Sequence, residues 1–360
     1  MSAPTVLARR RLIQRRPVRI AVVGVGYWGP NLVRNLLELD EAAVTLICDT
    51  DPNALASARR RWPQLPTTLH YEQALRDPDV DAVALATPVA THAGMAAAAL
   101  AAGKHVFVEK PLATSEQEAT ELLRLARRNG LVLMPGHTFL YSPAVTCVRE
   151  LITSGELGDV YFVSTSRLNL GIHQADASVF WDLAPHDVAI LRLWLDEVPS
   201  EVSAMSRSCV GAGVPDVAFV HLRFPSGTIA HLELGWLSPT KLRRSIVVGS
   251  RRMVMYDDTS RDPVRIYDSG VAPADPQSFG EFQLGYRTGD ILVPAVPAVE
   301  PLSLELRDFC AAVRSGSEPQ ASAQLGLDVV RVVEAIERSA EGGDAVAVSP
   351  PLSAGASGAG

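Results

Sequence analysis

The sequence predicts an α/β protein: a doubly wound parallel sheet, followed by an α+β domain with a largely antiparallel, open-faced sheet. From residue 17 to about residue 138, short apolar segments alternate with helical patterns, which is typical of a parallel sheet covered on both faces. Beyond residue 136, longer segments alternate between apolar and polar residues, as antiparallel strands with one open face do. A chain of 360 residues is also too long for one ordinary core, so two domains are expected.

Apolar segments and helical patterns alternate in the part that is expected to form the parallel sheet, residues 17 to about 138. The strands are expected at residues 18–23, 44–48, 80–86, 106–108 and 131–134. The helices are expected between them, at residues 31–39, 54–61, 90–102 and 115–129. The last of these helices runs into Asn129-Gly130, a pair that commonly ends helices because glycine accepts a left-handed backbone.

The second part begins with a helix at residues 143–154, for which Ser142 is the expected cap and Pro143 the first helical residue. Strands are expected at residues 160–167, 216–224, 228–236, 245–249, 252–256 and 264–267, and helices at 304–313 and 325–340. The second and third strands form a hairpin around Pro225-Ser226-Gly227. Its polar face carries His221, Arg223, His231 and Glu233, and its apolar face Val220, Leu222, Ala230, Leu232 and Leu234. One face of this sheet is therefore expected to be open to a partner subunit or a ligand.

Composition and charge exclude several classes of protein. The net charge of −7 argues against nucleic acid as the main partner, and no apolar run reaches the ~18 residues of a membrane helix. The four cysteines are far apart and form no C-x-x-C pair, which fits a reducing cytoplasm and neither a disulfide framework nor a metal site. The arginines at positions 9, 10, 11, 15 and 16 could form a nucleic-acid or membrane patch; we favour a disordered arm or an upstream start codon.

The first strand leads into the most informative motif, the G-x-G-x-x-G formed by Gly24, Gly26 and Gly29. In a Rossmann fold, the first glycine allows a tight turn, the second lets the backbone approach a pyrophosphate, and the third lets the helix lie close to the strand. The helix N-terminus then supplies free N–H groups and partial positive charge. A glycine-rich turn alone is weak support, and a plain β-turn-α unit is the alternative.

Asp49 strengthens this interpretation, because it ends the second strand 20 residues after Gly29. An acid at that place accepts hydrogen bonds from the adenosine ribose. Thr50 and Asp51 follow, with no basic residue that would pair a 2′-phosphate, so NAD is favoured over NADP. The expected parts of the chain are a disordered basic arm (1–16), an NAD-binding Rossmann domain (17–138), an α+β substrate and oligomerisation domain (139–340) and a disordered tail (341–360).

Polar residues follow the later strands of the parallel part. Glu109-Lys110-Pro111 comes after residues 106–108, and ligands of doubly wound sheets lie outside the carboxyl ends of the strands. Lys110 could therefore stabilise a substrate oxygen as it becomes an oxyanion or ketone, although a surface lysine is the simpler alternative. Thr87-Pro88 with Thr91-His92, and Gly136-His137-Thr138, occupy comparable places after their strands.

A second polar constellation lies in Trp181-Asp182-Leu183-Ala184-Pro185-His186-Asp187. Asp182 and His186 are four residues apart, so on a helix they share a face. A carboxylate near an imidazole orients the ring and stabilises its charged form, which suits a general base. The structural alternative makes Asp182 a helix cap and His186 an early helical residue.

Together these motifs resemble the Gfo/Idh/MocA family of NAD(P)-dependent sugar and polyol oxidoreductases, over about residues 17–340. The resemblance implies a Rossmann domain with an open-faced α+β domain, and a catalytic set of Lys110, Asp182 and His186. It further implies cofactor contacts from Gly24, Gly26, Tyr27, Trp28, Gly29, Asp49, Thr87, Pro88, His92, Glu109, Lys110 and His137. The substrate contacts that it implies are Lys110, Tyr141, Arg167, Asn169, His173, Asp182 and His186.

Three finer stretches, at residues 26–31, 136–141 and 167–171, are similar to enzymes that oxidise nucleotide sugars at C3. These include the UDP-N-acetylglucosamine and UDP-N-acetylglucosaminuronate 3-dehydrogenases. An inositol or polyol dehydrogenase and a ketosugar reductase remain alternatives, and a non-catalytic NAD-binding sensor is an alternative of another class. We expect a cytoplasmic homodimer or homotetramer that takes a small-molecule substrate and has no metal.

Overall fold

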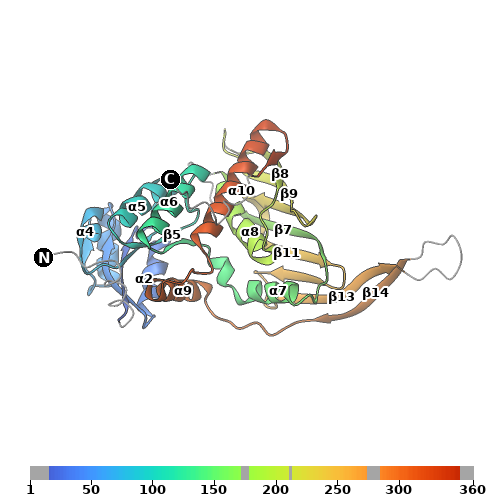
Figure 1. The fold of residues 1–360 in the computed structure, drawn as a ribbon, viewed down its shortest axis with the longest axis horizontal. Helices are drawn as coiled ribbons and strands as arrows, with labels where there is room; N and C mark the ends of the chain where they lie inside the picture. Colours follow the sequence, from blue (N-terminus) through green and yellow to red (C-terminus); the bar gives the residue numbers. More distant parts are fainter. Residues whose placement is uncertain (1–15, 172–177, 211–212, 274–283, 349–360) are drawn as a thin grey trace, which may run out of the picture. The chain divides into compact units, whose positions relative to one another are not determined.

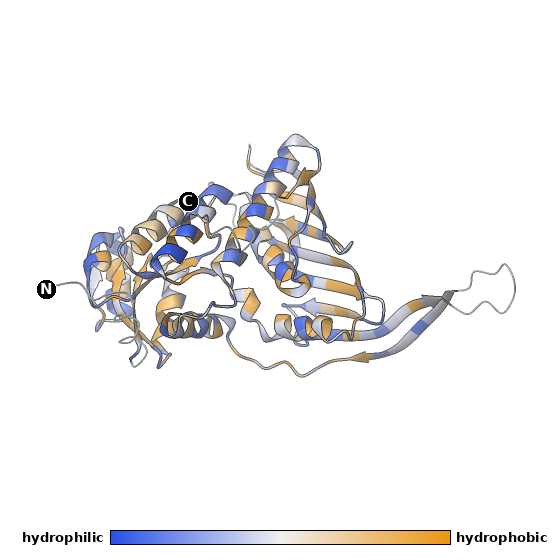
Figure 2. Ribbon diagram, viewed as in Figure 1, coloured by the Kyte–Doolittle hydropathy of each residue, from blue (hydrophilic) through white to orange (hydrophobic). Residues whose placement is uncertain are grey.

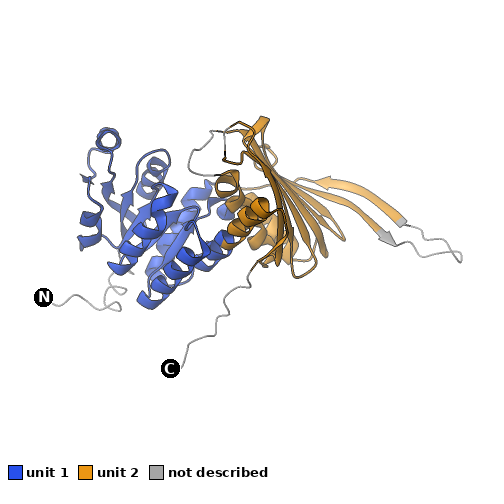
Figure 3. Cartoon of the chain, turned by 90° about the horizontal axis from the view of Figure 1, so that it is seen from above, with its two compact units in different colours: residues 1–142, 299–330 blue, residues 143–298, 331–360 orange. Residues whose placement is uncertain are grey.

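A computed structural model describes residues 16–171, 178–210, 213–273 and 284–348 of the chain. The chain divides into two compact units, one of residues 1–142 and 299–330 and the other of residues 143–298 and 331–360 (Figure 3). Each unit is built on one sheet (Figure 1).

The sheet of unit 1 is parallel throughout and has the order β3-β2-β1-β4-β5-β6. This is the doubly wound order of a dinucleotide-binding fold, so the expected fold class of this part is confirmed. Its two central strands, β1 and β4, are almost fully buried, as their continuous apolar sequences predict. The strands are β1 Val18–Val23, β2 Ala42–Cys48, β3 Thr67–Thr68, β4 Ala82–Leu85, β5 His105–Glu109 and β6 Leu133–Gly136.

The helices of unit 1 follow from ordinary capping chemistry. In α6, the Ser115 hydroxyl accepts a hydrogen bond from the Glu118 N–H at 3.2 Å, and Gly130 ends the helix with a φ of 63°. The helix pairs α2 with α9 and α5 with α6 pack together. The elements are α2 Gly29–Leu37, α3 Pro52–Arg61, α4 Tyr71–Arg76, η1 Val89–Thr91, α5 His92–Ala101, α6 Glu116–Asn129, η2 Thr138–Tyr141 and α9 Pro301–Ser315.

Helix α9 corrects the expected domain boundaries. Residues 299–330 were expected in the α+β domain, but they belong to unit 1. The reason is the apolar face of α9: Leu306, Phe309 and Val313 are buried, and the Phe309 ring meets the Phe107 ring of β5 edge-on, with centroids 5.8 Å apart. An amphipathic helix shows that it has a core-facing side, but not which core it faces.

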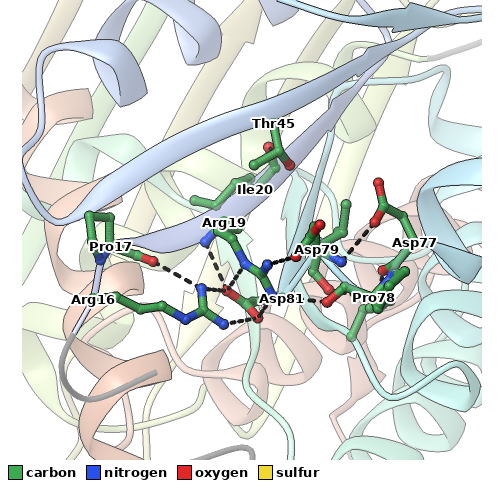
Figure 4. A network of polar contacts seen from close by, with 11 residues as sticks. Arg16, Pro17, Arg19, Ile20, Thr45, Asp77, Pro78, Asp79 and Asp81 are labelled. Atoms are coloured by element: carbon green, nitrogen blue, oxygen red, sulfur yellow. Dashed lines mark hydrogen bonds and ion pairs between the residues drawn. The ribbon is translucent and has the colours of Figure 1, made fainter. Parts of the chain in front are cut away.

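An acidic residue joins the start of β1 to the start of β4. Asp81 accepts hydrogen bonds from Arg16 at 2.8 and 3.0 Å, and from the backbone N–H of Arg19 at 3.0 Å (Figure 4). The Arg19 guanidinium also bonds this carboxylate. Arg16, which the sequence assigned to a disordered arm, is thus held by an ion pair; residues 1–15 lie outside the described part of the chain.

The sheet of unit 2 is mixed and mostly antiparallel, with the order β14-β13-β12-β11-β7-β10-β9-β8-β15. The expected hairpin is present as β9 and β10, and β10 also lies parallel to β7. The strands are β7 Val160–Leu170, β8 Glu201–Arg207, β9 Val217–Arg223, β10 Ile229–Gly235, β11 Leu237–Gly249, β12 Met253–Asp257, β13 Val264–Pro273, β14 Leu284–Leu292 and β15 Val346–Ala347.

Helices lie on one side of this sheet (Figure 3). Helix α7 (Pro143–Thr153) packs on β12 and β13, and α8 (Val179–Leu195) packs on β9 and β10. Hydrophobic and hydrophilic residues alternate along the strands (Figure 2), and the apolar side of the hairpin is buried as expected, for example at Val220 and Leu232. Phe219 and Ile229 are exposed on the opposite side.

The end of the chain departs from the expected disordered tail. Helix α10 runs from Ala323 to Gly342, beyond the predicted end at residue 340, and β15 then pairs antiparallel with β8. The Ser339 hydroxyl also accepts a hydrogen bond from the Ala204 N–H at 2.9 Å. The described helices include none whose length and apolar character would suffice to cross a membrane.

Candidate active site

The glycine turn of unit 1 tolerates no side chain at two of its three glycines. Gly24 has a φ of +86°, and a Cβ there would lie 2.5 Å from the Ala86 carbonyl oxygen. A Cβ at Gly29 would overlap the Gly24 carbonyl oxygen. At Gly26 a Cβ would meet nothing within 4 Å, so the space above the turn is open. Helix α2 has no side-chain hydrogen bond at its N-cap, Trp28, so the turn and the helix end fit a pyrophosphate.

Asp49 is fixed beside this turn by backbone groups. Its Oδ2 accepts a hydrogen bond from the Val25 N–H at 2.7 Å, and its Oδ1 accepts one from the Asp51 N–H at 2.9 Å. The neighbouring Asp51 has a different task, because it caps α3 by accepting from the Asn53 N–H. Asp49 is therefore the acid that faces the glycine turn, where the ribose of a dinucleotide is expected.

His92 connects two turns at the carboxyl edge of the sheet. Its Nδ1 lies 2.8 Å from the Pro111 carbonyl oxygen, and its Nε2 lies 2.9 Å from the Thr87 carbonyl oxygen. The ring is buried and ties the turn after β4 to the turn after β5, which contains a cis peptide bond between Lys110 and Pro111. Its expected cofactor contact stays a prediction.

Glu109 contacts three motifs at this edge of the sheet: the glycine turn through Trp28, its own neighbour Lys110, and the segment that begins at Gly136. Burial raises the pKa of its carboxyl to about 7, and the Lys110 ammonium and a hydrogen bond with the Trp28 side chain act in the opposite direction. Its carboxyl also lies against Gly136, where a Cβ would be 3.0 Å from Oε2. The residue as a whole is half-buried, whereas its Oε1 is fully buried.

His137 follows Gly136 and is almost fully buried. Burial lowers the pKa of its imidazole to about 3, and the nearby Lys110 charge adds to this, so the ring is neutral. Neither ring nitrogen has a hydrogen-bond partner among the described residues. Buried polar atoms normally have partners, so this ring is suited to meet a ligand that donates and accepts.

Unit 2 carries the second polar constellation on α8. Asp182 and His186 are one turn apart on this helix, as the sequence predicts, and the cap is Ser178, so Asp182 lies in the first turn. The indole N–H of Trp236 donates to Asp182 Oδ2 at 3.0 Å. A role for Trp236 was not anticipated from the sequence; the signal was a large aromatic residue at the end of the expected strand 228–236, whose N–H needs a partner when buried.

The residues that the resemblance implies as substrate contacts differ in whether the protein already supplies their hydrogen-bond partners. Arg167 forms a buried ion pair with Asp187, with Nη2 to Oδ1 at 2.8 Å. The Tyr141 hydroxyl donates to Asp308 Oδ2 at 2.6 Å within unit 1. Asn169 Oδ1 is buried and lacks a hydrogen-bond partner among the described residues. His173 lies outside the described part of the chain.

No group of three or more metal-ligating side chains occurs among the residues that the structure describes. The assignments of Lys110, Asp182 and His186 as catalytic residues, and of the cofactor and substrate contacts, stay predictions. Within unit 1, the structure brings the glycine turn, Asp49, Glu109 and His137 to the carboxyl side of the sheet. Within unit 2, it places Asp182 and His186 on one helix.

Comparison with known proteins places both parts of the chain in one family. Residues 18–137 match the model of the oxidoreductase family with an NAD-binding Rossmann fold, and residues 145–255 match the GFO/IDH/MocA C-terminal domain. A protein from Magnetospirillum magnetotacticum MS-1, described as an oxidoreductase, has a crystal structure with a TM-score of 0.75 and 30% identity; the match covers 88% of this chain and 99% of that one.

Two curated relatives have named activities. The dTDP-3,4-didehydro-2,6-dideoxy-α-D-glucose 3-reductase of Saccharopolyspora spinosa is 27% identical over 71% of this chain and 81% of its own length. The scyllo-inositol 2-dehydrogenase (NAD+) of Bacillus subtilis is 28% identical over 84% of this chain and 88% of its own length. The chain therefore belongs to the GFO/IDH/MocA family of NAD-binding oxidoreductases.

Proposed function

We propose that this enzyme transfers a hydride between NAD and a ring carbon of a sugar, and that its substrate is a nucleotide sugar with the reacting oxygen at C3. The observation that carries the proposal is the chemistry of the two constellations. Lys110 directly follows β5 at the carboxyl edge of the NAD-binding sheet, and α8 presents a carboxylate and an imidazole one turn apart. A cation and a carboxylate-oriented base are what the oxidation of a hydroxyl needs.

In the proposed reaction, His186 takes the proton of the sugar hydroxyl while Asp182 orients the ring and stabilises its charge. Lys110 donates a hydrogen bond to the same oxygen and stabilises the negative charge that develops there. Bound NAD supplies the acceptor for the hydride that leaves the carbon bearing this oxygen. The alcohol becomes a ketone, and the proton stays on His186. In the reverse direction, His186 returns the proton to the oxygen. Positioning of the reacting groups contributes on the order of several kcal/mol.

Two observations support a nucleotide sugar. The stretches at residues 26–31, 136–141 and 167–171 resemble nucleotide-sugar 3-dehydrogenases, and one relative is named a reductase that acts at C3 of a dTDP-sugar. A polyol is the second candidate, because another relative is named an inositol dehydrogenase. The direction of the reaction follows from the concentrations of the substrates in the cell, and either direction uses the same residues.

The test is a spectrophotometric screen of nucleotide sugars, free sugars and inositols with NAD, following the absorbance of the reduced cofactor. We expect the highest kcat/KM for a nucleotide sugar, and a 3-keto product identified by mass spectrometry after trapping of the carbonyl. A higher kcat/KM for an inositol would replace the proposal with the polyol candidate. Tight NADH binding without turnover of any compound would favour the NAD-binding sensor. The Lys110→Met variant, which lacks the proposed oxygen ligand, is the control for background reduction.

A further inference from the structure

A buried carboxyl group in unit 1 has no role in the proposed reaction. Glu305, on α9, has an exposed fraction of 0%. The Thr138 hydroxyl donates a hydrogen bond to its Oε2 at 2.7 Å, and its Oε1 is buried without a partner among the described residues. A glutamate is rarely fully buried unless it is paired, so this one needs an explanation.

Glu305 and Glu109 hold the same short segment from its two ends. The Glu109 carboxyl lies against Gly136, and Glu305 bonds Thr138 two residues later. His137 lies between these two contacts and has no partner for either ring nitrogen among the described residues. The segment that carries this imidazole is therefore positioned by α9 as well as by β5.

The surroundings of Glu305 disfavour its ionised form. Burial, and after it the charges of Glu109 and Asp308, raise the pKa of Glu305 well above its usual value, and only the Thr138 hydrogen bond lowers it. The charge of Lys110, which directly follows β5, lowers the pKa values of Glu109 and His137. Of the other charged groups of α9 and of α2, which packs against it, Arg34 pairs with Glu300 and Arg307 with Glu41, whereas Arg314 lies near Cys310.

The unpartnered oxygen of Glu305 also favours a neutral carboxyl. Its Oε1 is buried and has no hydrogen-bond partner among the described residues. Burying an ionised carboxylate oxygen without a hydrogen bond costs far more free energy than burying a neutral polar group in the same way.

We propose that Glu305 is a positioning residue that acts as a neutral carboxylic acid. Through Thr138 it fixes the segment that carries His137, and the other carboxyl of the cluster, that of Glu109 next to Lys110, is then the one that can ionise. The proposal deepens the proposed function, because it concerns the residues around the lysine that is assigned to the substrate oxygen. Its tests use NADH and the folded protein alone, so a failure to find the sugar does not affect them.

The first test measures protonation through stability. The free energy of unfolding of the wild type and of Glu305→Gln is measured with denaturant at several pH values from 5 to 8. Glu305 ionises near its ordinary pKa in the unfolded chain but stays neutral in the folded protein. The folded-to-unfolded ratio of the wild type should therefore fall, relative to Glu305→Gln, about tenfold per pH unit until Glu305 ionises in the fold. The proposal would be overturned if the free energies of unfolding of the wild type and of Glu305→Gln changed with pH in parallel. Glu72→Gln, an exposed glutamate of unit 1, is the matched control and should run parallel to the wild type.

The second test measures positioning through NADH fluorescence titrations. Glu305→Gln has the size and neutrality of a protonated glutamate. Its dissociation constant for NADH should therefore stay within about twofold of the wild type and should not change at alkaline pH. Glu305→Ala and Thr138→Val should each weaken NADH binding, by roughly tenfold for the loss of one buried hydrogen bond. The two losses should not add in the double variant, because both remove the same contact. If Glu305→Ala does not fold, Thr138→Val decides. Wild-type affinity in Thr138→Val, or full loss in Glu305→Gln, would overturn the proposal.

Discussion

The orientation of the Asp49 carboxylate is fixed by the backbone around it. Both of its oxygens accept backbone N–H groups, from Val25 and Asp51, so the carboxylate cannot turn away from the glycine turn. A charge that is fixed in this way acts on whatever the ribose carries, because an anionic 2′-phosphate next to it would be repelled.

Asp49→Ala should reduce the preference for NAD over NADP. The substitution removes the repulsion of a 2′-phosphate and also the acceptor for the ribose hydroxyls, so NAD binding weakens while NADP binding holds or improves. Titrations of both reduced cofactors by fluorescence measure the two dissociation constants. Tighter binding of NADP than of NAD by the wild type would contradict the assignment of Asp49. Asp51→Ala is the control; it removes a helix cap and should lower stability without changing the preference.

Lys110→Met and His186→Asn should fold normally, bind NAD and lose turnover by roughly two to four orders of magnitude, the usual effect of a positioned acid–base group. The losses should not add fully in the double variant, because both residues act on one transition state. Steady-state kinetics, NADH titration and the melting temperature are measured together. Near-normal turnover in His186→Asn, with a normal melting temperature, would remove this histidine from the mechanism.

Spacing in the sequence can predict which residues share an element, but not which distant side chain each one meets. The interval of four between Asp182 and His186 correctly predicted one helical face. A partner of Asp182, Trp236, lies between β10 and β11 and could not be inferred from spacing. The same holds for Tyr141, whose hydroxyl bonds Asp308 about 170 residues further along the chain.

At the scale of elements, two charged clusters join strands and helices. In unit 2, Arg167 of β7 and Asp187 of α8 form a buried ion pair, with exposed side-chain fractions of 6% and 4%. In unit 1, Asp81 joins the starts of β1 and β4 through Arg16 and Arg19 (Figure 4). The first pair is shielded from water and the second is partly exposed, so they should respond to different perturbations.

Asp187→Ala should destabilise unit 2 by about 3–5 kcal/mol, because it leaves the Arg167 charge buried without its main partner. Denaturant unfolding measures the loss. The double variant Arg167→Met with Asp187→Leu should recover most of it, since apolar residues of similar size replace both charges. A loss below 1 kcal/mol in the single variant would mean that water or another group compensates the arginine.

Asp81→Asn should lower stability at neutral pH and have little effect in acid. Burial alone would raise the pKa of Asp81, but hydrogen bonds from Arg16 and Arg19 outweigh it and hold the pKa below its ordinary value of 3.8. A lowered pKa adds stability above the unfolded value, and this contribution disappears as the pH falls through the folded value. Unfolding curves from pH 3 to 7 should therefore converge at the acid end. Asp40→Asn, at an exposed position, is the control. A stability difference between the wild type and Asp81→Asn that stays constant with pH would contradict the lowered pKa of Asp81.

Strands with clear alternation or a continuous apolar run were predictable, whereas β3, β8, β14 and β15 were not. The hairpin β9–β10 and all the long strands of unit 1 lie where the sequence predicts them, within a few residues. Strand β8 was missed because only Val202 and Ala204 of its seven residues are buried. Strand β15 has two residues and exists only through its pairing with β8. Strands like these two depend on pairing with a neighbour more than on their own sequence.

At the scale of the molecule, the described helices of unit 2 lie on one side of its sheet, and the other face is the one considered for a partner. The exposed apolar residues on or near this face include Phe162, Phe219 and Ile229. His221 and His231 lie opposite each other on β9 and β10, with ring centroids 4.9 Å apart. We propose that a second copy of the chain covers this face, which is a common arrangement for proteins with an open sheet.

Light scattering at micromolar concentration should give a dimer, or a tetramer built from dimers. Phe219→Asp should shift the protein to the monomer, because a carboxylate would be buried without a partner in the proposed interface. Leu69→Asp is the matched control, since Leu69 is equally exposed but lies in unit 1. A wild type that is only monomeric would contradict the proposal.

Helix α9 has one more consequence, which concerns protein synthesis. Phe309 completes the packing around Phe107, yet about two hundred residues separate the two in the chain. A ribosome makes the whole of β1 to β6 and residues 143–298, the first segment of unit 2, before α9 emerges. Unit 1 therefore cannot close its core while it is the only part outside the tunnel, and the usual order, in which the N-terminal domain folds first, does not apply. During translation the nascent Rossmann sheet carries an uncovered apolar face, which is the kind of surface that chaperones bind.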